Sequence, residues 1–373
     1  MAIYRQRCYA KISKSALLHN YNVIKNYSQS EICAVVKANA YGHDALICSQ
    51  ILQEAGAVYL AVTSINEGIY LRENDITTPV LILSHTPAEL AADLVKYNLT
   101  QTVASFEYAK DLSASLVGCE NLLNVHVKID SGMSRLGILC QTVDDIASAA
   151  DEVENIFAIK NLDCEGIFTH LSSADGAETA DVKFTQNQFI CFKNLIANLK
   201  ARDVEFKFSH IANSTGVANY PDNSFNMVRC GLSLYGYNNA VRDIDLKPVL
   251  SLAAKVISVK NLPKGAPVSY NRTHILQKDS AVATISAGYA DGVNRALSNV
   301  GAVMIKDKSC KILGRVCMDY VMVDVTNLDV KAGDEALIIC DEISATDHAK
   351  TASTIEYEIL CNISARVPRV LAD

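Results

Sequence analysis

The sequence lacks any segment that is long and apolar enough to cross a membrane. Every apolar run falls short of the roughly 18 uncharged residues that a membrane-spanning helix needs. The first residues, MAIYRQRCYAKISKSALLHN, also lack the continuous apolar core of a secretory signal peptide. We therefore expect a cytoplasmic protein without a membrane partner.

The sequence also lacks a disulfide or metal-binding cysteine pattern. Its 12 cysteines are scattered, none forms a CxxC pair, and several, such as Cys33 and Cys340, lie within apolar runs. Scattered cysteines in a chain this large are usually reduced residues of the core. We expect no metal, and we keep a structural zinc site or disulfides as the less favoured alternatives.

An excess of positive charge is missing as well, because the formal net charge is -7 at pH 7. A nucleic-acid-binding surface needs basic residues in excess, so we expect no nucleic-acid partner. With 50% hydrophobic and 20% charged residues, the composition is that of a well-packed globular protein. A length of 373 residues allows two domains, or one barrel with an addition.

Between Glu31 and about Gly236, eight short apolar runs alternate with helix-like segments. The helix-like segments include residues 45–56, 88–98 and 185–203. This alternation predicts a parallel sheet covered on its faces, and eight such units fit a closed (β/α)8 barrel of the TIM type. An open doubly wound sheet is the competing fold, but no GxGxxG turn follows the first strand. The eight runs are ICAVVKA, VYLAVT, PVLILS, TQTVAS, NVHVKID, EGIFTH, FKFSHIA and MVRCGLSLYG.

After about Asp245 the pattern changes to strand-like runs with few helical spacers. Runs such as LAAKVISVKNL, VATISAGYADG and MDYVMVDVTNL follow one another closely, which is typical of a small, mostly-β domain. We therefore predict an α/β barrel at residues 13–245 and an all-β domain at residues 246–373. Residues 1–12 include a strand-like segment, CYAKIS, that can join either domain, the C-terminal one included.

Polar side chains follow the ends of several predicted strands, where a barrel carries its chemistry. Taken singly, these residues can have purely structural roles. His170 can be a hydrogen-bonded structural residue, and Lys128 and Arg135 can be ion-pair partners of Asp130. Several cations at one barrel mouth are harder to explain by packing, because unpaired buried charge is costly, and a bound anion would resolve the cost. The strand-end residues are Lys37, Tyr41, Lys128, Asp130, Arg135, Thr169, His170, His210, Asn213, Ser214, Arg229 and Gly231.

Lys37 is the most informative of these residues. At the mouth of an apolar barrel, among other cations, its pKa should fall, and a neutral amine can form a Schiff base with an aldehyde. Pyridoxal 5′-phosphate would supply both the aldehyde and the anion. Tyr41 would then donate to its phosphate, and Ser214 with the backbone amides of Gly231 and Leu232 would complete the cradle.

Six motifs, in order along nearly the whole chain, resemble the alanine racemase family. They are AVVKANAYGHD, KIDSGMSRLG, HIANSTG, MVRCGLSLYG, ISAGYADG and GRVCMDYVMVDV. The resemblance implies an N-terminal (β/α)8 barrel, a C-terminal β domain, pyridoxal phosphate as cofactor and a head-to-tail homodimer. It also implies an isomerase that interconverts L- and D-alanine.

The resemblance assigns a role to each matching position. Lys37 matches the Schiff-base lysine, which is also one catalytic base, and Tyr289 matches the second base, supplied by the other subunit. Arg229 matches the arginine that faces the pyridine nitrogen. Tyr41, Ser214 and the amides of Gly231 and Leu232 match phosphate ligands. His170 matches a neighbour that orients the arginine, and Arg135 matches a residue that positions the tyrosine. Lys128 matches a lysine that is often carbamylated, and Met318 matches a residue whose amide meets the substrate carboxylate.

Racemisation explains why two bases are needed. One base cannot easily reach both faces of a planar centre, so a lysine and a tyrosine on opposite sides are expected, each with a pKa brought toward the operating pH; Arg135 could lower that of the tyrosine. Arg229, always charged, would keep the pyridine nitrogen unprotonated and favour racemisation over decarboxylation. A decarboxylase and a non-catalytic protein that carries pyridoxal phosphate remain as alternatives.

The segment CNISARVPR departs from the family pattern at one position. Ala365 stands where the family usually has a tyrosine that touches the phosphate and narrows the entrance. A neutral hydrogen bond lost there costs roughly 0.5–1.5 kcal/mol, too little to abolish cofactor binding. A wider entrance is the larger consequence, and it predicts relaxed specificity, with serine or a slightly larger amino acid accepted beside alanine.

Overall fold

The computed structural model describes residues 7–223 and 225–373. They form two compact units. The barrel unit consists of Leu18–Ala40 and Ala45–Lys247, and the β unit consists of residues 7–17, Tyr41–Asp44 and Pro248–Asp373. The part of the predicted N-terminal segment before Arg7 lies outside the described residues.

The barrel unit is a nearly closed ring of eight parallel strands, which confirms the predicted fold class. The strands follow the order β10-β2-β3-β4-β5-β6-β8-β9, and a backbone bond of 2.9 Å from Arg229 N to Ala212 O links the last strand region to β10. A two-residue strand, β7 (Ile138–Leu139), pairs with the end of β6. The eight strands are β2 (Glu31–Val35), β3 (Tyr59–Val62), β4 (Val80–Ile82), β5 (Leu99–Val103), β6 (Leu123–Asp130), β8 (Leu162–Phe168), β9 (Phe208–His210) and β10 (Met227–Cys230).

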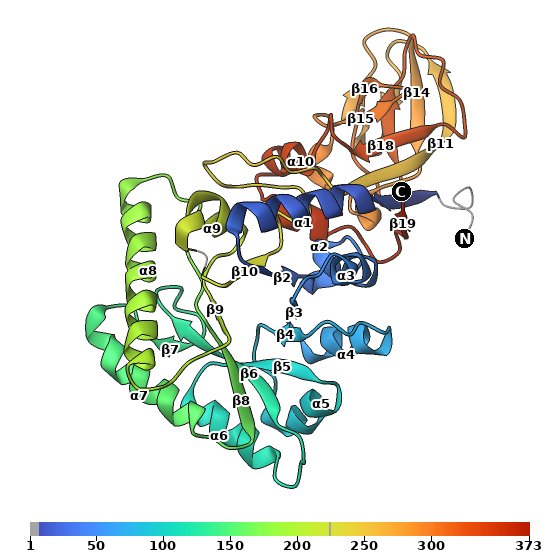
Figure 1. The fold of residues 1–373 in the computed structure, drawn as a ribbon. Helices are drawn as coiled ribbons and strands as arrows, with labels where there is room; N and C mark the ends of the chain where they lie inside the picture. Colours follow the sequence, from blue (N-terminus) through green and yellow to red (C-terminus); the bar gives the residue numbers. More distant parts are fainter. Residues whose placement is uncertain (1–6, 224) are drawn as a thin grey trace. The chain divides into compact units, whose positions relative to one another are not determined.

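Helices cover the outside of these strands (Figure 1). Helix α7, for example, buries Ala149, Val153 and Ile156 at helical spacing. The strands, buried on both faces, therefore read as continuous apolar runs rather than alternating ones. The helices are α1 (Lys14–Ser28), α2 (Lys37–Tyr41), α3 (Ala45–Glu54), α4 (Ile65–Glu73), α5 (Ala91–Lys96), α6 (Phe106–Ser115), α7 (Ile146–Phe157), α8 (Thr179–Lys200) and α9 (Ser214–Asn219).

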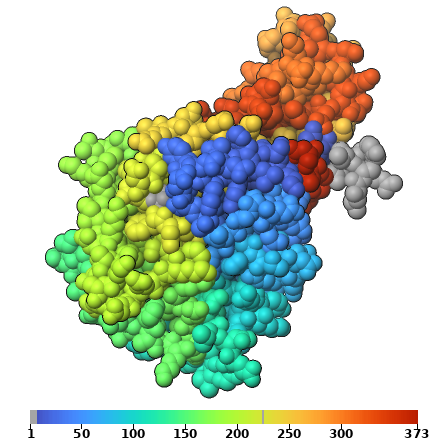
Figure 2. Space-filling view, viewed as in Figure 1, coloured from blue at the N-terminus to red at the C-terminus, as the bar shows by residue number. Residues whose placement is uncertain are grey.

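One buried amide joins the first helix of the barrel unit to the end of the unit's sequence. The Nδ2 of Asn20 donates to the carbonyls of Leu234 at 2.9 Å and Lys247 at 2.8 Å, and its Oδ1 accepts the Lys247 amide. The space-filling view shows the two segments side by side, in blue and yellow (Figure 2). This contact brings sequence-distant parts of the barrel together with every polar atom of the amide satisfied.

The β unit is built around the 13-residue strand β11, which pairs with three neighbours. Strand β1 runs antiparallel to β11 and parallel to β19, so the chain's first described strand belongs to this sheet. Two short helices, α10 (Ala345–Ala352) and α11 (Glu356–Cys361), were not foreseen from the sequence. The strands are β1 (Cys8–Ile12), β11 (Leu250–Leu262), β12 (Pro267–Val268), β13 (His274–Ile275), β14 (Ser280–Ile285), β15 (Ala302–Ile305), β16 (Lys308–Lys311), β17 (Val321–Asp324), β18 (Glu335–Ile339) and β19 (Arg369–Leu371).

All 12 cysteines are free thiols, and 9 of them are buried. Burial raises the pKa of the Cys33 and Cys230 thiols to about 12, so both are protonated core groups at neutral pH. Across residues 7–223 and 225–373, no helix has the length and apolarity to span a bilayer.

Candidate active site

Lys37 follows β2 and begins a left-handed turn. Ala38, Asn39 and Ala40 have φ of 52°, 53° and 53° and ψ near 50°, and Tyr41 also has a φ of 52°. Such a conformation costs roughly 1–2 kcal/mol for each residue that is not glycine. A run of four is strain that the surrounding contacts must sustain, and strain of this kind concentrates at functional sites.

Two side chains hold the left-handed turn from within the barrel unit. The Oε1 of Glu67 accepts the amide of Ala38 at 2.7 Å, and the Oδ1 of Asn39 accepts the amide of Ala45 at 2.8 Å. The other oxygen of Glu67 accepts the amides of Thr63 and Ser64, in the capping box that begins α4. Glu67 was missed from the sequence, although the Ser-x-x-Glu spacing signals its capping role.

The segment after the turn, Tyr41–Asp44, belongs to the β unit. A Cβ on Gly42, whose φ is +85°, would lie 2.1 Å from the carbonyl oxygen of Leu360, so glycine is required there. Arg369 donates from Nε to the Gly42 carbonyl at 2.8 Å, and the rings of Tyr41 and Tyr357 lie 5.6 Å apart. These contacts hold the Tyr41 ring and the backbone of the next residue, Gly42, within the β unit.

Lys128 is a buried cation with an unusual environment. Its Nζ donates to the carbonyl of Ile129 at 2.5 Å and lies 5.4 Å from the centre of the Phe168 ring. Burial, with the nearby Arg229 as the next cause, lowers the pKa of Lys128 from 10.5 to about 7, against the opposing attraction of Asp130. A substantial fraction of this amine is therefore neutral at neutral pH.

Asp130 holds a loop rather than a cation. Its Oδ1 accepts the amides of Gly132, Met133 and Ser134 at 2.9–3.0 Å. In the part of the chain that the structure describes, neither Lys128 nor Arg135 forms an ion pair with it, so that interpretation of the two cations is wrong. The exposed Arg135 retains a guanidinium without an acidic partner among those residues.

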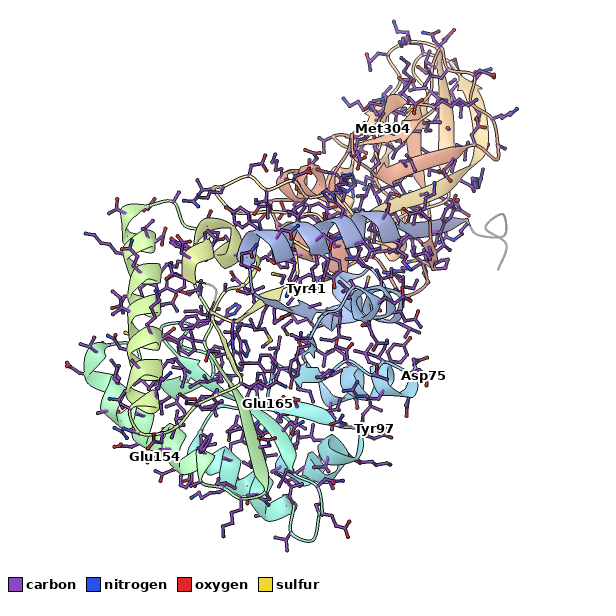
Figure 3. All side chains as sticks on the ribbon, in the orientation of Figure 1. Tyr41, Asp75, Tyr97, Glu154, Glu165 and Met304 are labelled. Carbon is purple, nitrogen blue, oxygen red and sulfur yellow. The ribbon has the colours of Figure 1, made fainter. Side chains whose placement is uncertain are left out.

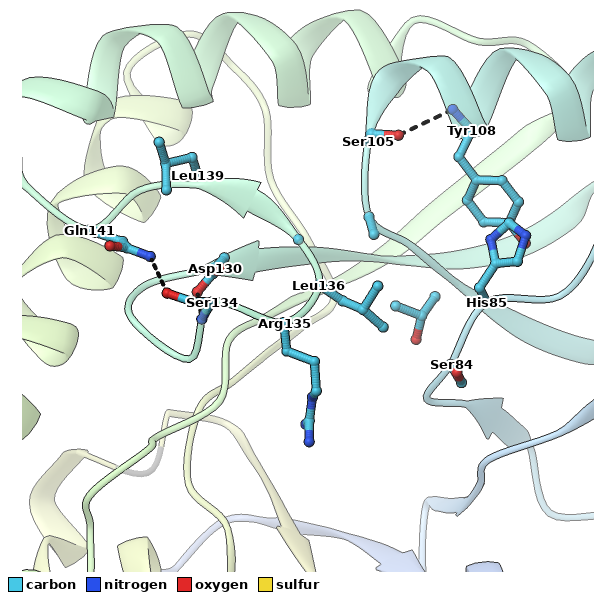
Figure 4. Close-up of a pocket in the computed structure, with 13 residues that line it drawn as sticks. Ser84, His85, Ser105, Tyr108, Asp130, Ser134, Arg135, Leu136, Leu139 and Gln141 are labelled. Atoms are coloured by element: carbon cyan, nitrogen blue, oxygen red, sulfur yellow. Dashed lines mark hydrogen bonds between the residues drawn. The ribbon is translucent and has the colours of Figure 1, made fainter.

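Arg135 lines a cavity of about 610 Å³ beside the barrel mouth (Figure 4). The walls come from the ends of β4, β5 and β6, and include His85, Tyr108 and Gln141. Figure 4 shows the guanidinium reaching away from the loop, while Gln141 donates to the Ser134 hydroxyl at 3.1 Å. Lys37 and Arg229 are not among the lining residues. The cavity therefore adjoins the strand-end cations without containing them.

In the structure Arg229 contacts His170, the residue that the family resemblance assigns to orienting it. Nη2 of Arg229 lies 3.1 Å from Nδ1 of His170 and also donates to the carbonyls of Thr169 and Ile211. Nη1 lies 2.8 Å from Nδ1 of His210. No described residue accepts a hydrogen bond from the Nε of Arg229, so this N–H is left for a ligand.

Electrostatics keep this cluster in one protonation state. Burial, followed by the Arg229 charge, lowers the pKa of both His170 and His210 well below 6.5. Burial lowers the pKa of Arg229 to about 10, which still leaves it charged at neutral pH. Because arginine can only donate, both histidines are neutral acceptors at Nδ1.

Ser214 and Gly231 also meet, at the start of α9 and the end of β10. The Ser214 hydroxyl oxygen accepts the amides of Gly231 at 3.1 Å and Ser233 at 3.2 Å, and the Ser233 hydroxyl at 3.0 Å. The amide of Leu232 donates to no described residue. Convergent hydroxyls and backbone amides with few carboxylates fit an anion such as a phosphate group.

In the β unit, Tyr289 lies beside Met318. The amide of Tyr289 donates to the carbonyl of Cys317 at 2.9 Å, and that of Ala290 to the carbonyl of Met318 at 3.1 Å. Tyr289 is 44% exposed and Met318 is 52% exposed. The β unit thus presents a phenol and a backbone edge together on its surface.

A buried carboxylate fixes the Tyr289 loop. Asp291 accepts the amide of Gly288 at 2.9 Å, and both Arg7 and Arg366 bind its Oδ1 at 2.8 Å. Arg366 also donates to Asp319 at 2.8 Å. These residues were missed: the GYADG motif signalled the tyrosine but gave no sign that its aspartate binds arginines far away in sequence.

Ala365 is exposed and directly precedes Arg366. Ala365 takes no part in the hydrogen bonds that the Arg366 side chain makes to Asp291 and Asp319.

Comparison with protein families gives two adjoining matches. Residues 12–239 match the family described as alanine racemase, N-terminal domain, and residues 249–371 match alanine racemase, C-terminal domain. An alanine racemase of Clostridium tetani is 38% identical over 97% of this chain and 94% of its own. An alanine racemase of Carboxydothermus hydrogenoformans is 39% identical over 97% of this chain and 98% of its own.

Solved structures give the same result. The alanine racemase of Clostridium difficile 630 has a TM-score of 0.91 at 35% identity, over 98% of this chain and 96% of its own. A histidine racemase of Leuconostoc mesenteroides has a TM-score of 0.88 at 28% identity, over 99% of this chain and 98% of its own. The shared frame therefore includes relatives named for different amino acids.

Proposed function

The chain belongs to the alanine racemase family, and from this premise we propose that it is a pyridoxal phosphate-dependent enzyme that interconverts L- and D-alanine. The observation that carries the proposal is the buried, donor-only Arg229, with its Nε–H unclaimed by described residues. Decarboxylases of the same architecture use an acidic residue there. An acid would protonate a pyridine nitrogen, whereas arginine leaves it unprotonated.

The residues present fit the coenzyme. When bound, pyridoxal phosphate would supply an aldehyde for the amino group and a ring that withdraws charge from the α-carbon. Lys37 would hold the coenzyme through its amine. Ser214 with the amides of Gly231 and Leu232 would bind its phosphate, and Tyr41 would add a donor.

Two residues would move the proton. Lys37 would take or return it at the α-carbon from one face, and the partner subunit's Tyr289 would act on the opposite face. The exposure of Tyr289 and Met318 supports their donation to a neighbouring subunit in a homodimer. Arg135 would hold the tyrosine in position, and the Met318 amide would bind the substrate carboxylate.

Lys128 would carry a carbamate. Carbon dioxide reacts with the neutral amine, and a pKa of about 7 makes that form available. The amine adds to carbon dioxide, loses one proton and becomes an anion. That anion would pair with Arg135, which has no acidic partner among the described residues.

A racemisation assay with L- and D-alanine, with borohydride reduction and peptide mapping, tests the proposal. We expect either enantiomer to give equal amounts of L- and D-alanine at equilibrium. We also expect a pyridoxyl group on Lys37. An adduct at any other lysine would contradict the site assignment. A protein that takes up no coenzyme would contradict the function.

A second candidate function is racemisation of serine or a somewhat larger amino acid. Ala365 supports it, because the family tyrosine that narrows the entrance is missing. The similarity to a histidine racemase supports it too, since this frame occurs in a protein named for a larger amino acid. Comparing kcat/KM for L-serine and L-alanine decides between the two candidates. The cytoplasmic location stays a prediction.

A further inference from the structure

A chain of polar side chains runs through the interior of the barrel. It begins at Arg229, whose Nη1 lies 2.8 Å from Nδ1 of His210. Nε2 of His210 lies 2.9 Å from Nδ1 of His126. Nε2 of His126 lies 3.8 Å from Oε1 of Glu165, which is beyond hydrogen-bond distance but close enough for an electrostatic interaction, and both histidines are fully buried. The roles given to Arg229 so far do not require His126 or Glu165.

The donors and acceptors in this series of polar side chains all run in one direction, away from Arg229. Arg229 only donates, so His210 must accept at Nδ1 and carry its proton at Nε2. That proton points to Nδ1 of His126, which in turn must carry its proton at Nε2, facing Glu165. Burial and the Arg229 charge lower the pKa of His126 to about 3, consistent with a neutral ring. One cation thus selects the tautomer of two successive histidines.

The barrel wall is shaped to hold the His126 ring. A Cβ on Gly166 would lie 2.5 Å from three ring atoms, so only glycine leaves room for it in β8. The register of β6 against β8 shifts between Val125 and His126. The ring packs edge-on against Tyr59 at 5.1 Å.

This chain of polar side chains ends at Glu165, which belongs to β8 and is labelled within the barrel unit in Figure 3. The Tyr59 hydroxyl donates to it and lies 3.1 Å from the Thr100 hydroxyl. Glu165 lines a cavity of about 500 Å³, together with Glu31 and Lys207. A carboxylate here favours a proton on Nε2 of His126 rather than on Nδ1, because the charge attracts the N–H.

We propose that His126 and Glu165 are positioning residues for Arg229, acting through the tautomer of His210. The proposal rests on the proposed function, because it concerns the arginine that faces the coenzyme ring. If His126 cannot accept, the buried Nε2–H of His210 loses its partner, and His210 gains by moving its proton to Nδ1. That N–H would then oppose the Arg229 donor. The guanidinium would shift, and Arg229 would be less able to keep the pyridine nitrogen of a bound coenzyme unprotonated. Abortive transamination would then compete better with racemisation.

The tautomers are tested directly in the wild-type holoenzyme. Imidazole ¹⁵N chemical shifts separate protonated from unprotonated nitrogens, and the chain has only 8 histidines to assign. We expect both His126 and His210 to carry the proton at Nε2 throughout the stable pH range. An Nδ1–H on either ring overturns the proposal. This measurement needs no turnover, so it stands even where the proposed function fails.

A matched pair of variants tests the consequence. His126→Asn keeps an acceptor, since its Oδ1 branches from the same carbon as Nδ1, whereas His126→Leu has similar size without one. We expect His126→Leu to raise the ratio of abortive transamination to racemisation about tenfold, the effect of roughly one hydrogen bond. We expect His126→Asn to remain near wild type in this ratio and in the absorbance of the bound coenzyme. Equal ratios in both variants overturn the proposal.

Glu165→Gln tests the far end of the chain, with Glu31→Gln as its control. Glu31 lines the same cavity, but it pairs with Lys25 at 2.6 Å and is not one of the polar side chains that lead to Arg229. We expect a severalfold rise in the transamination ratio and a change in the His126 ¹⁵N shifts for Glu165→Gln only. A wild type without racemase activity would refute the proposed function. An active wild type with both glutamine variants alike would refute this inference alone.

Discussion

At the scale of single residues, the barrel unit buries more positive charge than it neutralises. Lys128 is 7% exposed and Arg229 is 4% exposed, and neither forms an ion pair within the described residues. Carbonyls accept hydrogen bonds from both cations, and neutral histidines also accept from Arg229, but none of these partners carries a compensating charge. A buried cation without a counter-ion destabilises the fold, so this cost must be offset elsewhere.

The cost of Lys128 gives the first prediction. Because its pKa is about 7 in the folded protein and 10.5 in the unfolded chain, folding stability from this group is lowest below pH 7 and rises between pH 7 and pH 10.5. Lys128→Met removes the penalty. We expect the free energy of unfolding of the variant to exceed that of wild type, and this difference to be larger at pH 7 than at pH 10 by on the order of 3 kcal/mol.

Urea unfolding of the coenzyme-free protein at both pH values, in buffer free of carbon dioxide, measures this difference. Lys160→Met, at an exposed lysine, is the control and should give the same small effect at pH 7 and pH 10. A gain for Lys128→Met that does not change with pH would show that Lys128 is not desolvated in the folded state.

Ala365 gives the second prediction. Replacing it with tyrosine restores the side chain that usually narrows the entrance, so the larger of two substrates should be penalised more. We expect Ala365→Tyr to lower the serine-to-alanine ratio of kcat/KM by about tenfold, in the range of small pocket changes. Ala365→Val, which adds bulk without a ring or hydroxyl, should give a smaller decrease. An unchanged ratio would mean that another side chain already fills the space.

The strand pattern put several polar residues at the barrel mouth but did not say which of them meet. Arg229 in β10 contacts His170, which follows β8, and only the family resemblance implied this pair. Asp291 meets Arg7 and Arg366, at sequence separations of 284 and 75 residues. No local pattern encodes a pair at such a distance. The role of Ala365 stays a prediction, because it depends on a bound substrate.

At the scale of elements, the left-handed turn after Lys37 gives the third prediction. Ala38 is exposed and has a φ of 52°, so Ala38→Gly removes backbone strain without opening a cavity. The added freedom of the unfolded chain offsets part of this gain. We expect a net rise of about 0.5–1 kcal/mol in the free energy of unfolding, measured by urea denaturation.

The same substitution in an ordinary helix is the control for this prediction. Ala197 is exposed in α8, where glycine should destabilise by about 1 kcal/mol. The two variants should therefore differ in sign. Destabilisation by Ala38→Gly would show that the turn is not left-handed in solution.

Periodicity explains which elements could be predicted. All eight barrel strands were identified because continuous apolar runs separated by helical segments have few other solutions. The turn at residues 38–41 was missed because a left-handed conformation is normally signalled by glycine, and only Gly42 is present. Helices α10 and α11, of 8 and 6 residues, were missed because such short helices carry little periodic signal among strands.

At the scale of the whole molecule, the units do not follow the order of the chain. Strand β1 pairs with β11, and Tyr41–Asp44 contacts α11 and the region around Arg369. The predicted division into residues 1–12, 13–245 and 246–373 stays a prediction. Strand pairing across 240 residues depends on tertiary structure, so the sequence pattern could identify β1 as a strand but not choose its partner.

The last prediction concerns the assembly. If each site uses Lys37 of one subunit and Tyr289 of the other, then a dimer of one Lys37→Ala and one Tyr289→Phe subunit has one intact site. Each variant alone should be nearly inactive. After equimolar unfolding and refolding together, half of the dimers are mixed and each has one working site out of two. We therefore expect about a quarter of wild-type racemase activity.

A chain that carries both substitutions provides the contrasting experiment. Mixed with wild type, it forms dimers in which one site lacks the lysine and the other lacks the phenol, so only wild-type pairs work and activity again falls to about a quarter. If lysine and tyrosine of the same chain formed the site, the single variants would never complement each other. The double variant would then leave half of the activity, because every wild-type chain would work whatever its partner. The two mixtures together therefore distinguish a site shared between subunits from one contained in a single chain.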